Sequence, residues 1–144
     1  MSINEHLIMV PATEADDEEA LERHMEDEGL YLGKSWQALH WILAGGDFFA
    51  ESAISGGEPI DGIDHGSAPP PQLVRQDDVA RFATELDAMT EARVRELFDI
   101  EAMKADGVWP ANPDIEELVL LAAEVCAFYK TASAERCAVL QVWS

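Results

Sequence analysis

One long apolar stripe near the end of the chain constrains the fold more than any other feature. Its members recur with helical period over nearly four turns: Leu118, Leu121, Ala122, Val125, Tyr129 and Ala132. The run Cys137 to Trp143 follows, rich in Val and Leu, and predicts a terminal strand. A second apolar run, His6 to Val10, is ended by Pro11 and predicts a first strand. We therefore expect an α+β fold, with about six helices packed on a small sheet that includes both terminal strands.

The residues between these strands predict mostly helices. Thr13 resembles the start of a capping box, which predicts a helix to about Glu28 that Gly29 ends. Further helices are expected after Ser35, Thr90 and Asp99, and another has Asp77 and Asp78 in its first turn. A short turn of helix is expected over Phe48 to Ser55. Residues 58–71 contain three consecutive prolines and predict a loop. Neither half offers a convincing core alone, so residues 1–144 are expected to form a single domain.

The charge of the chain limits its partners. Twenty-nine acidic residues against nine Lys and Arg residues give a formal net charge of -20. Such a surface repels phosphate backbones and anionic headgroups, which disfavours binding to nucleic acids or membranes. It favours a basic protein partner, or it keeps the protein soluble, or it reflects an acidic host proteome. The acidic residues are densest from Thr13 to Glu28.

Localisation follows from what the sequence lacks. The N-terminal residues have neither a basic region nor a long apolar run, so no secretory signal is expected. No segment approaches eighteen uninterrupted apolar residues, so no membrane span is expected. Cys126 and Cys137 stand at no metal-ligand spacing, and we expect them to be reduced thiols. These features together predict a cytoplasmic protein.

No stretch carries a motif for a cofactor, a metal ion or a nucleophile. His40 is the histidine most suited to act as a base, but the sequence offers no Ser or Cys near it, so a buried structural histidine is favoured. The segment Asp61 to His65 has cation-binding side chains but lacks the glutamate of a calcium loop, with Gln72 in its place. Lys34-Ser35 alone is no phosphate loop. The four tryptophans favour core positions over a ligand-stacking wall. We therefore expect no metal and no cofactor.

An ordered series of motifs resembles a known bacterial family. Residues 33–45, GKSWQALHWILAG, are similar to the "K-S-W-x-x-L-H-x-L-L-T-G" signature of the YfbM-like family. Residues 54–60, Phe98-Asp99-Ile100, residues 107–110 and Phe128-Tyr129 agree as well, so the resemblance is good from about Leu30 onward. It implies a small α+β cytoplasmic protein and supplies no activity or catalytic residue. Gln72 stands where the family usually has an arginine, so the fixed charge and bidentate donors that could bind an anionic ligand are missing at this position.

Two functional hypotheses follow. The leading one is a non-enzymatic module, similar in character to immunity proteins, that binds a basic protein through its acidic surface. The alternative is a small-molecule-binding protein or enzyme with a pocket between the helix after Ser35 and the loop Glu58 to Gln72. The candidate ligand or interaction site for that pocket consists of Lys34, Trp36, His40 and Gln72. The sequence does not choose between these hypotheses, and it leaves the oligomeric state open.

Overall fold

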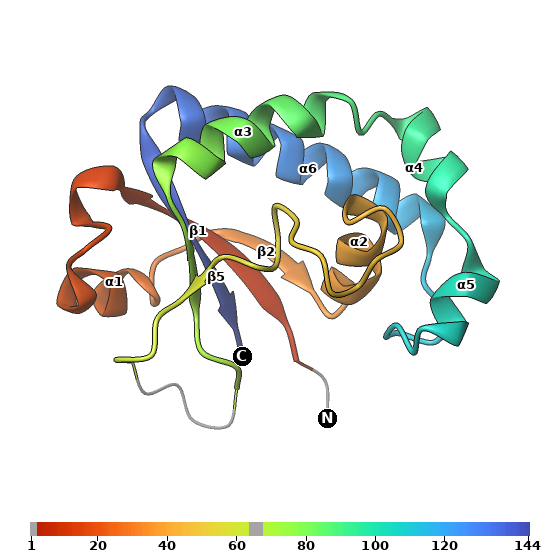
Figure 1. Ribbon diagram of the computed structural model, residues 1–144, viewed down its shortest axis with the longest axis horizontal. Helices are drawn as coiled ribbons and strands as arrows, with labels where there is room; N and C mark the ends of the chain where they lie inside the picture. Colours follow the sequence, from red (N-terminus) through yellow and green to blue (C-terminus); the bar gives the residue numbers. More distant parts are fainter. Residues whose placement is uncertain (1–2, 64–67) are drawn as a thin grey trace.

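Within the part of the chain that the structure describes, five antiparallel strands form one sheet at the centre of the protein (Figure 1). The computed structural model describes residues 3–63 and 68–144. The strands lie in the order β2-β1-β5-β4-β3: β1 Glu5–Pro11, β2 Leu30–Gly33, β3 Glu58–Pro59, β4 Gln72–Val74 and β5 Cys137–Trp143. The terminal strands β1 and β5 pair along their whole length, from Glu5 opposite Trp143 to Pro11 opposite Cys137. The expectation that both terminal strands belong to one sheet is confirmed.

In residues 3–63 and 68–144, six α-helices are distributed unequally over the two faces of the sheet: α1 Glu18–His24, α2 Trp36–Leu43, α3 Gln76–Asp87, α4 Glu91–Leu97, α5 Ile100–Ala105 and α6 Ile115–Ala134. Helices α2 to α6 contribute to the larger hydrophobic cluster, and α3 and α6 lie side by side over the strands (Figure 1). Helix α1 contributes Leu21 to a second, smaller cluster with Ile8 and Leu140. The α+β class is thus confirmed.

The alternation of side chains along β1 and β5 decides which residues meet which helices. Successive strand residues point to opposite faces. Ile8 belongs to the smaller cluster under α1, and Leu7 belongs to the larger cluster under α2, α3 and α6. Glu5 is two residues from Leu7 and therefore also points toward the larger cluster. Two polar residues of the strands, Glu5 and Gln141, consequently lie inside the main core, each with 0% of its surface exposed.

The N-terminal helix differs from its prediction. The start at Thr13 is wrong, because residues Ala12–Glu14 form a 3-10 turn and Asp17 caps α1 by accepting a hydrogen bond of 3.2 Å from the Ala20 amide. The helix also ends early, at His24, whose ring bonds to Asp27 and Glu14.

Most of the other expected helices are confirmed, with exceptions in the middle of the chain. Thr90 and Asp99 cap α4 and α5 through their side chains. Ser35 stands at the start of α2, but its hydroxyl donates to Glu117 at 2.7 Å instead of capping the helix. Residues 48–55 form turns and an isolated bridge between Ser52 and Ser55, so the helix expected there is wrong. The strands β2, β3 and β4 were not predicted.

Three further expectations concern metals, cysteines and membranes. Asp64 and His65 of the possible cation loop lie outside the described residues. Within the described part of the chain, no group of three or more His, Cys, Asp or Glu is arranged to hold a metal ion. Cys126 and Cys137 are both free thiols. No helix of residues 3–63 and 68–144 is long and apolar enough to cross a membrane.

Candidate functional site

The histidine expected to be structural is engaged on both ring nitrogens. His40 lies on α2 with 2% of its surface exposed. Its Nε2 is 2.8 Å from the carbonyl oxygen of Phe48, and its Nδ1 is 2.8 Å from Oγ of Ser52. Because a carbonyl only accepts, Nε2 carries the proton and Nδ1 accepts from the Ser52 hydroxyl. Burial lowers the pKa of His40, which favours this neutral form.

Ser52 corrects the expectation that no serine lies near His40. The pair has the hydrogen-bond pattern of a nucleophile and its base. However, Ser52 Oγ also accepts from the amide of Ile54 at 3.2 Å, and only 4% of Ser52 is exposed. The hydroxyl is therefore occupied as donor and as acceptor inside a turn. We interpret the hydrogen bond between His40 and Ser52 as a structural contact that holds residues 48–54 against α2.

Two of the other three predicted site residues are hydrogen-bonded within the described part of the chain. Trp36 donates from Nε1 to the carbonyl of Ile3 at 3.0 Å and packs edge-on against Trp143 at 5.7 Å between ring centroids. Gln72 accepts a hydrogen bond of 2.8 Å from the Gly56 amide. Lys34 is exposed. Trp36, His40 and Gln72 thus bond to this chain itself, so their polar groups are committed to the fold.

A buried polar cluster fastens the segment Ser52–Gly57 to the core. The carbonyl oxygen of Ala53 accepts from the Tyr129 hydroxyl on α6 and from Nε2 of Gln141 on β5, the latter at 3.1 Å. Oε1 of Gln141 also accepts from the Gly57 amide at 3.1 Å. Since His40 and Gln72 bond to the same segment, four elements hold it by side chains.

Glu5 is a carboxylic acid buried in the main core. Neither of its carboxyl oxygens is bonded to any residue within 3–63 or 68–144. Burial raises the pKa of Glu5 well above its usual range, because a charge is costly away from water. Glu5 was not predicted from the sequence, although the alternation that places Leu7 in the core also places Glu5 there. Such a group is unusual enough to require a function or an explanation.

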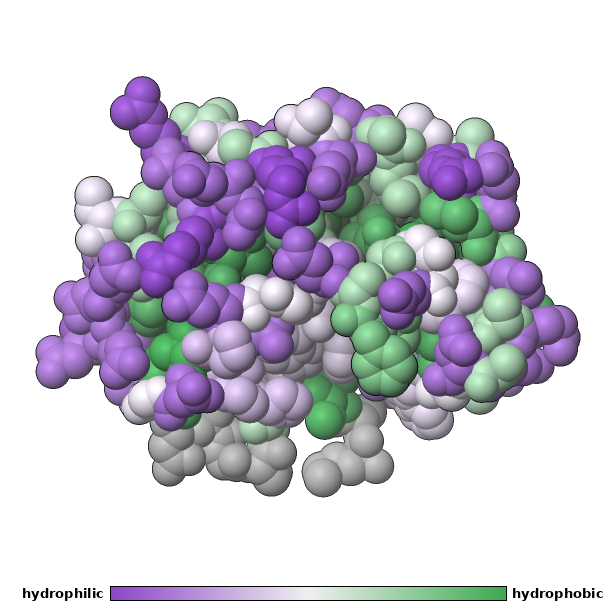
Figure 2. All heavy atoms as spheres, viewed as in Figure 1, coloured by the Kyte–Doolittle hydropathy of each residue, from purple (hydrophilic) through white to green (hydrophobic). Residues whose placement is uncertain are grey.

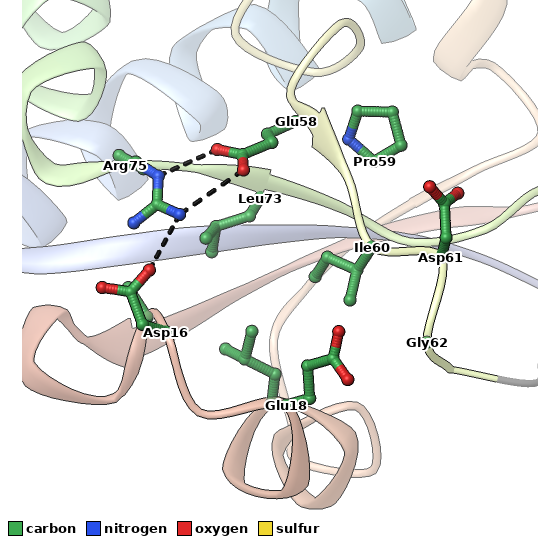
Figure 3. A pocket seen from close by; sticks show the side chains of 11 residues that line it. Asp16, Glu18, Glu58, Pro59, Ile60, Asp61, Gly62, Leu73 and Arg75 are labelled. Carbon is green, nitrogen blue, oxygen red and sulfur yellow. Dashed lines mark hydrogen bonds and ion pairs between the residues drawn. The ribbon is translucent and has the colours of Figure 1, made fainter.

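A cavity of about 280 Å³ lies on the other side of the sheet, between α1 and β3 (Figure 3). Leu21, Ile60 and Leu73 give it an apolar wall. Carboxylates stand around that wall. Figure 3 shows Glu18 pointing into the space below Ile60, while the side chain of Asp61 points away from it.

The carboxylates of this cavity differ in what neutralises them. Arg75 is 2.9 Å from Asp16 and 2.8 Å from Glu58, so one guanidinium holds two acidic side chains (Figure 3). The hydrogen bond from Arg75 lowers the pKa of Glu58, and the same bond raises the pKa of Arg75. Glu18 has no ion pair with any residue in the described ranges. No sequence pattern marks Glu18 or Arg75 as part of a site, because both lie in stretches of the sequence that are rich in acidic residues.

The cavity lies within a larger acidic surface, which we call the α1 surface. Its ten exposed acidic residues are Asp16, Asp17, Glu18, Glu19, Glu22, Glu26, Asp27, Glu28, Glu58 and Asp61. Two arginines, Arg23 and Arg75, lie among them. Hydrophilic residues cover the left side of the view in Figure 2, where Figure 1 places α1. The charge expected over Thr13 to Glu28 is therefore gathered on one side of the folded protein.

Comparison with known proteins identifies the family and no activity. The model of the family described as domain of unknown function DUF1877 matches residues 4–142. The solved structure of YfbM from Escherichia coli, described as a protein of unknown function, is similar with a TM-score of 0.68 and 14% sequence identity, over 96% of this chain and 98% of that chain. At this identity the likeness shows the fold alone. No curated protein matches the sequence. The YfbM-like resemblance is thereby confirmed, and the chain belongs to the DUF1877 family.

Proposed function

We propose that this protein is a binding module for a basic protein, which docks on the α1 surface. One observation carries the proposal: Glu18 points into the cavity beside α1 and has no ion pair within the described residues, while Arg75 neutralises the neighbouring Asp16 and Glu58. A cationic group is therefore the ligand that this cavity lacks.

The shape of the cavity fits a lysine or arginine side chain. Such side chains bury their methylene stems against apolar surface and keep the charged end near polar groups. The apolar wall of Leu21, Ile60 and Leu73 would contact the stem, and Glu18 would receive the charge. The surrounding carboxylates would attract a basic partner at long range and raise its association rate, with a strong dependence on salt.

The alternative of a small-molecule pocket at Lys34, Trp36, His40 and Gln72 has less support. Three of these residues already bond to this chain, as their hydrogen bonds to Ile3, Phe48 and Gly56 indicate. A ligand would have to displace bonds that hold the core together.

Charge reversal at one position tests the proposal. The tagged protein and its Glu18→Lys variant are compared in quantitative co-purification from native cells. The matched control is Glu124→Lys, which makes the same change of net charge at an exposed position of α6. We expect a basic protein that Glu18→Lys loses and Glu124→Lys retains.

The same comparison can be made with a defined ligand. Tetralysine titrated into the protein at low salt should shift the NMR signals of residues 16–28 and 58–62, and Glu18→Gln should weaken this more than Glu124→Gln does. Equal behaviour of the two variants in both experiments would refute the role of the α1 surface.

A further inference from the structure

The buried carboxyl of Glu5 lies on the same face of the sheet as Gln141, which is two residues along β5 from Trp143, the pairing partner of Glu5. Burial raises the pKa of the Tyr129 phenol well above its usual range, and the electrostatic effect of nearby Glu5 adds to this rise. The hydroxyl of Tyr129 donates to the carbonyl of Ala53, and Nε2 of Gln141 donates to the same carbonyl. Glu5 itself receives no hydrogen bond from the described residues. The Ala53 carbonyl therefore accepts two hydrogen bonds, while the Glu5 carboxyl accepts none from the described residues.

This arrangement is stable only while Glu5 is neutral. A neutral carboxylic acid can be buried at moderate cost, but an ionised carboxylate must be paired or hydrogen-bonded. Hydrogen bonds to an ionised acceptor are about twice as strong as those between neutral groups. A charged Glu5 would thus compete with the Ala53 carbonyl for the Tyr129 hydroxyl and the Gln141 amide.

Among the residues that the structure describes, the strand neighbours of Glu5 offer no cation to prevent this competition. On β2 its pairing partner is Gly33, which has no side chain, and on β5 it is Trp143, whose indole cannot carry a positive charge. From α6 the titratable group is Tyr129, which is neutral at physiological pH. On α2 the titratable group is His40, whose ring is hydrogen-bonded to Phe48 and Ser52. Burial lowers the pKa of His40, so it too is neutral at physiological pH.

We propose that Glu5 is a proton-controlled latch for the segment Ser52–Gly57. With Glu5 neutral, Tyr129 and Gln141 hold Ala53 and the segment is closed. When Glu5 releases its proton to solvent, the carboxylate takes these two donors, Ala53 loses both hydrogen bonds, and the segment opens. One proton leaves Glu5 for each opening. Glu58 directly follows the segment, so opening also loosens one wall of the cavity beside α1. The latch does not depend on the function proposed for that cavity.

Hydrogen exchange at the segment reports the latch directly, because its amides are bonded to identified acceptors. Ser52 and Ser55 bond to each other's carbonyls, Gly56 bonds to Gln72, and Gly57 bonds to Gln141. Amide exchange of the intact protein is measured from pH 5 to pH 8 and corrected for the intrinsic pH dependence of exchange. If one proton is released per opening, protection of residues 52–57 should fall about tenfold per pH unit between the ordinary and the raised pKa of Glu5.

Two variants separate the latch from a general loss of stability. Glu5→Gln has nearly the same shape and cannot ionise, so its protection at residues 52–57 should not change with pH. The control Glu124→Gln removes an exposed carboxyl of α6 and should retain the wild-type pH dependence. Protection of α6, followed in the same spectra, distinguishes opening of the segment from unfolding of the whole domain.

A Tyr129→Phe variant tests the competition for donors. It keeps the aromatic ring and removes one donor, so residues 52–57 should be less protected at every pH. The latch is overturned if wild-type protection of the segment does not depend on pH, if Glu5→Gln keeps the wild-type dependence, or if α6 loses protection in parallel with the segment.

Discussion

A methyl group added at Gly29 should detach β2 from β1. Gly29 immediately precedes β2, and a Cβ at this position would lie 2.0 Å from the carbonyl oxygen of Leu7 and 2.9 Å from its carbonyl carbon. These are backbone atoms of the neighbouring strand, so no side-chain rotation relieves the collision. In Gly29→Ala the start of β2 must therefore move away from β1, where Leu7 pairs with Leu30 and His6 with Tyr31.

The expected loss of stability follows from the contacts at stake. Weakening the two residue pairs costs about 1 kcal/mol for each hydrogen bond lost. Partial exposure of Leu32, which is buried on the same strand, costs roughly another 1 kcal/mol, since full burial of a leucine contributes about 2 kcal/mol. We expect Gly29→Ala to lower the free energy of unfolding by about 3 kcal/mol, a large part of the roughly 5 to 15 kcal/mol typical of a domain.

Urea denaturation followed by tryptophan fluorescence measures this loss, and Gly45→Ala serves as the matched control. Gly45 follows α2 with φ of 70°, and a Cβ added there would have no described atom within 4 Å. Its substitution costs only the left-handed conformation, about 1 to 2 kcal/mol. If Gly29→Ala were no more destabilising than Gly45→Ala, the close approach of Gly29 to β1 would be refuted.

Three other predictions concern buried and capping groups. Glu5→Gln should be more stable than the wild type at neutral pH, because the pKa of Glu5 is raised in the folded protein. The free energy of unfolding of the wild type should be highest below the ordinary glutamate pKa and should fall by about 1.4 kcal/mol per pH unit until the raised pKa is reached. Denaturation at a series of pH values measures this fall. Tyr129→Phe should cost about 1 to 3 kcal/mol in urea denaturation, because the Ala53 carbonyl loses a buried donor. Asp17→Ala should lower the thermal midpoint by the equivalent of about 1 kcal/mol, whereas Thr13→Ala should have little effect, since Asp17 caps α1.

Elements were predicted well from the sequence where one local pattern was sufficient. The stripe from Leu118 to Ala132 and the run Cys137 to Trp143 indicated α6 and β5 because periodicity and length agreed. At α1 several acidic residues suit a cap, so Thr13 and Asp17 could not be distinguished by residue type. The short strand β4 has only three residues, and its existence depends on β5, which is far away in the sequence.

The residues of the candidate site were harder to predict because their roles depend on the folded neighbours. Ser52 approaches His40 only because the glycines after α2 turn the chain back. A charged residue near the N-terminus, such as Glu5, is expected to be exposed to solvent. Glu5 is buried because it pairs with Trp143 on the central strand β5. Glu18 is one of many acidic residues, and it is distinguished only by its position beside Ile60 and by the engagement of Arg75 elsewhere.

The pairing of β1 with β5 has a consequence for how the protein can be made. These two strands lie next to each other at the middle of the sheet, and hydrogen bonds of 2.8 and 2.9 Å between Asn4 and Ser144 extend their contact. During synthesis β1 emerges first, but its partner β5 leaves the ribosome more than a hundred residues later. Until then β1 and β4 each lack a neighbour in the sheet, and their apolar faces remain uncovered. Contacts between residues so far apart in sequence form slowly. The nascent chain therefore passes through a long interval with uncovered apolar strand surface, which is the condition that makes folding intermediates prone to aggregation.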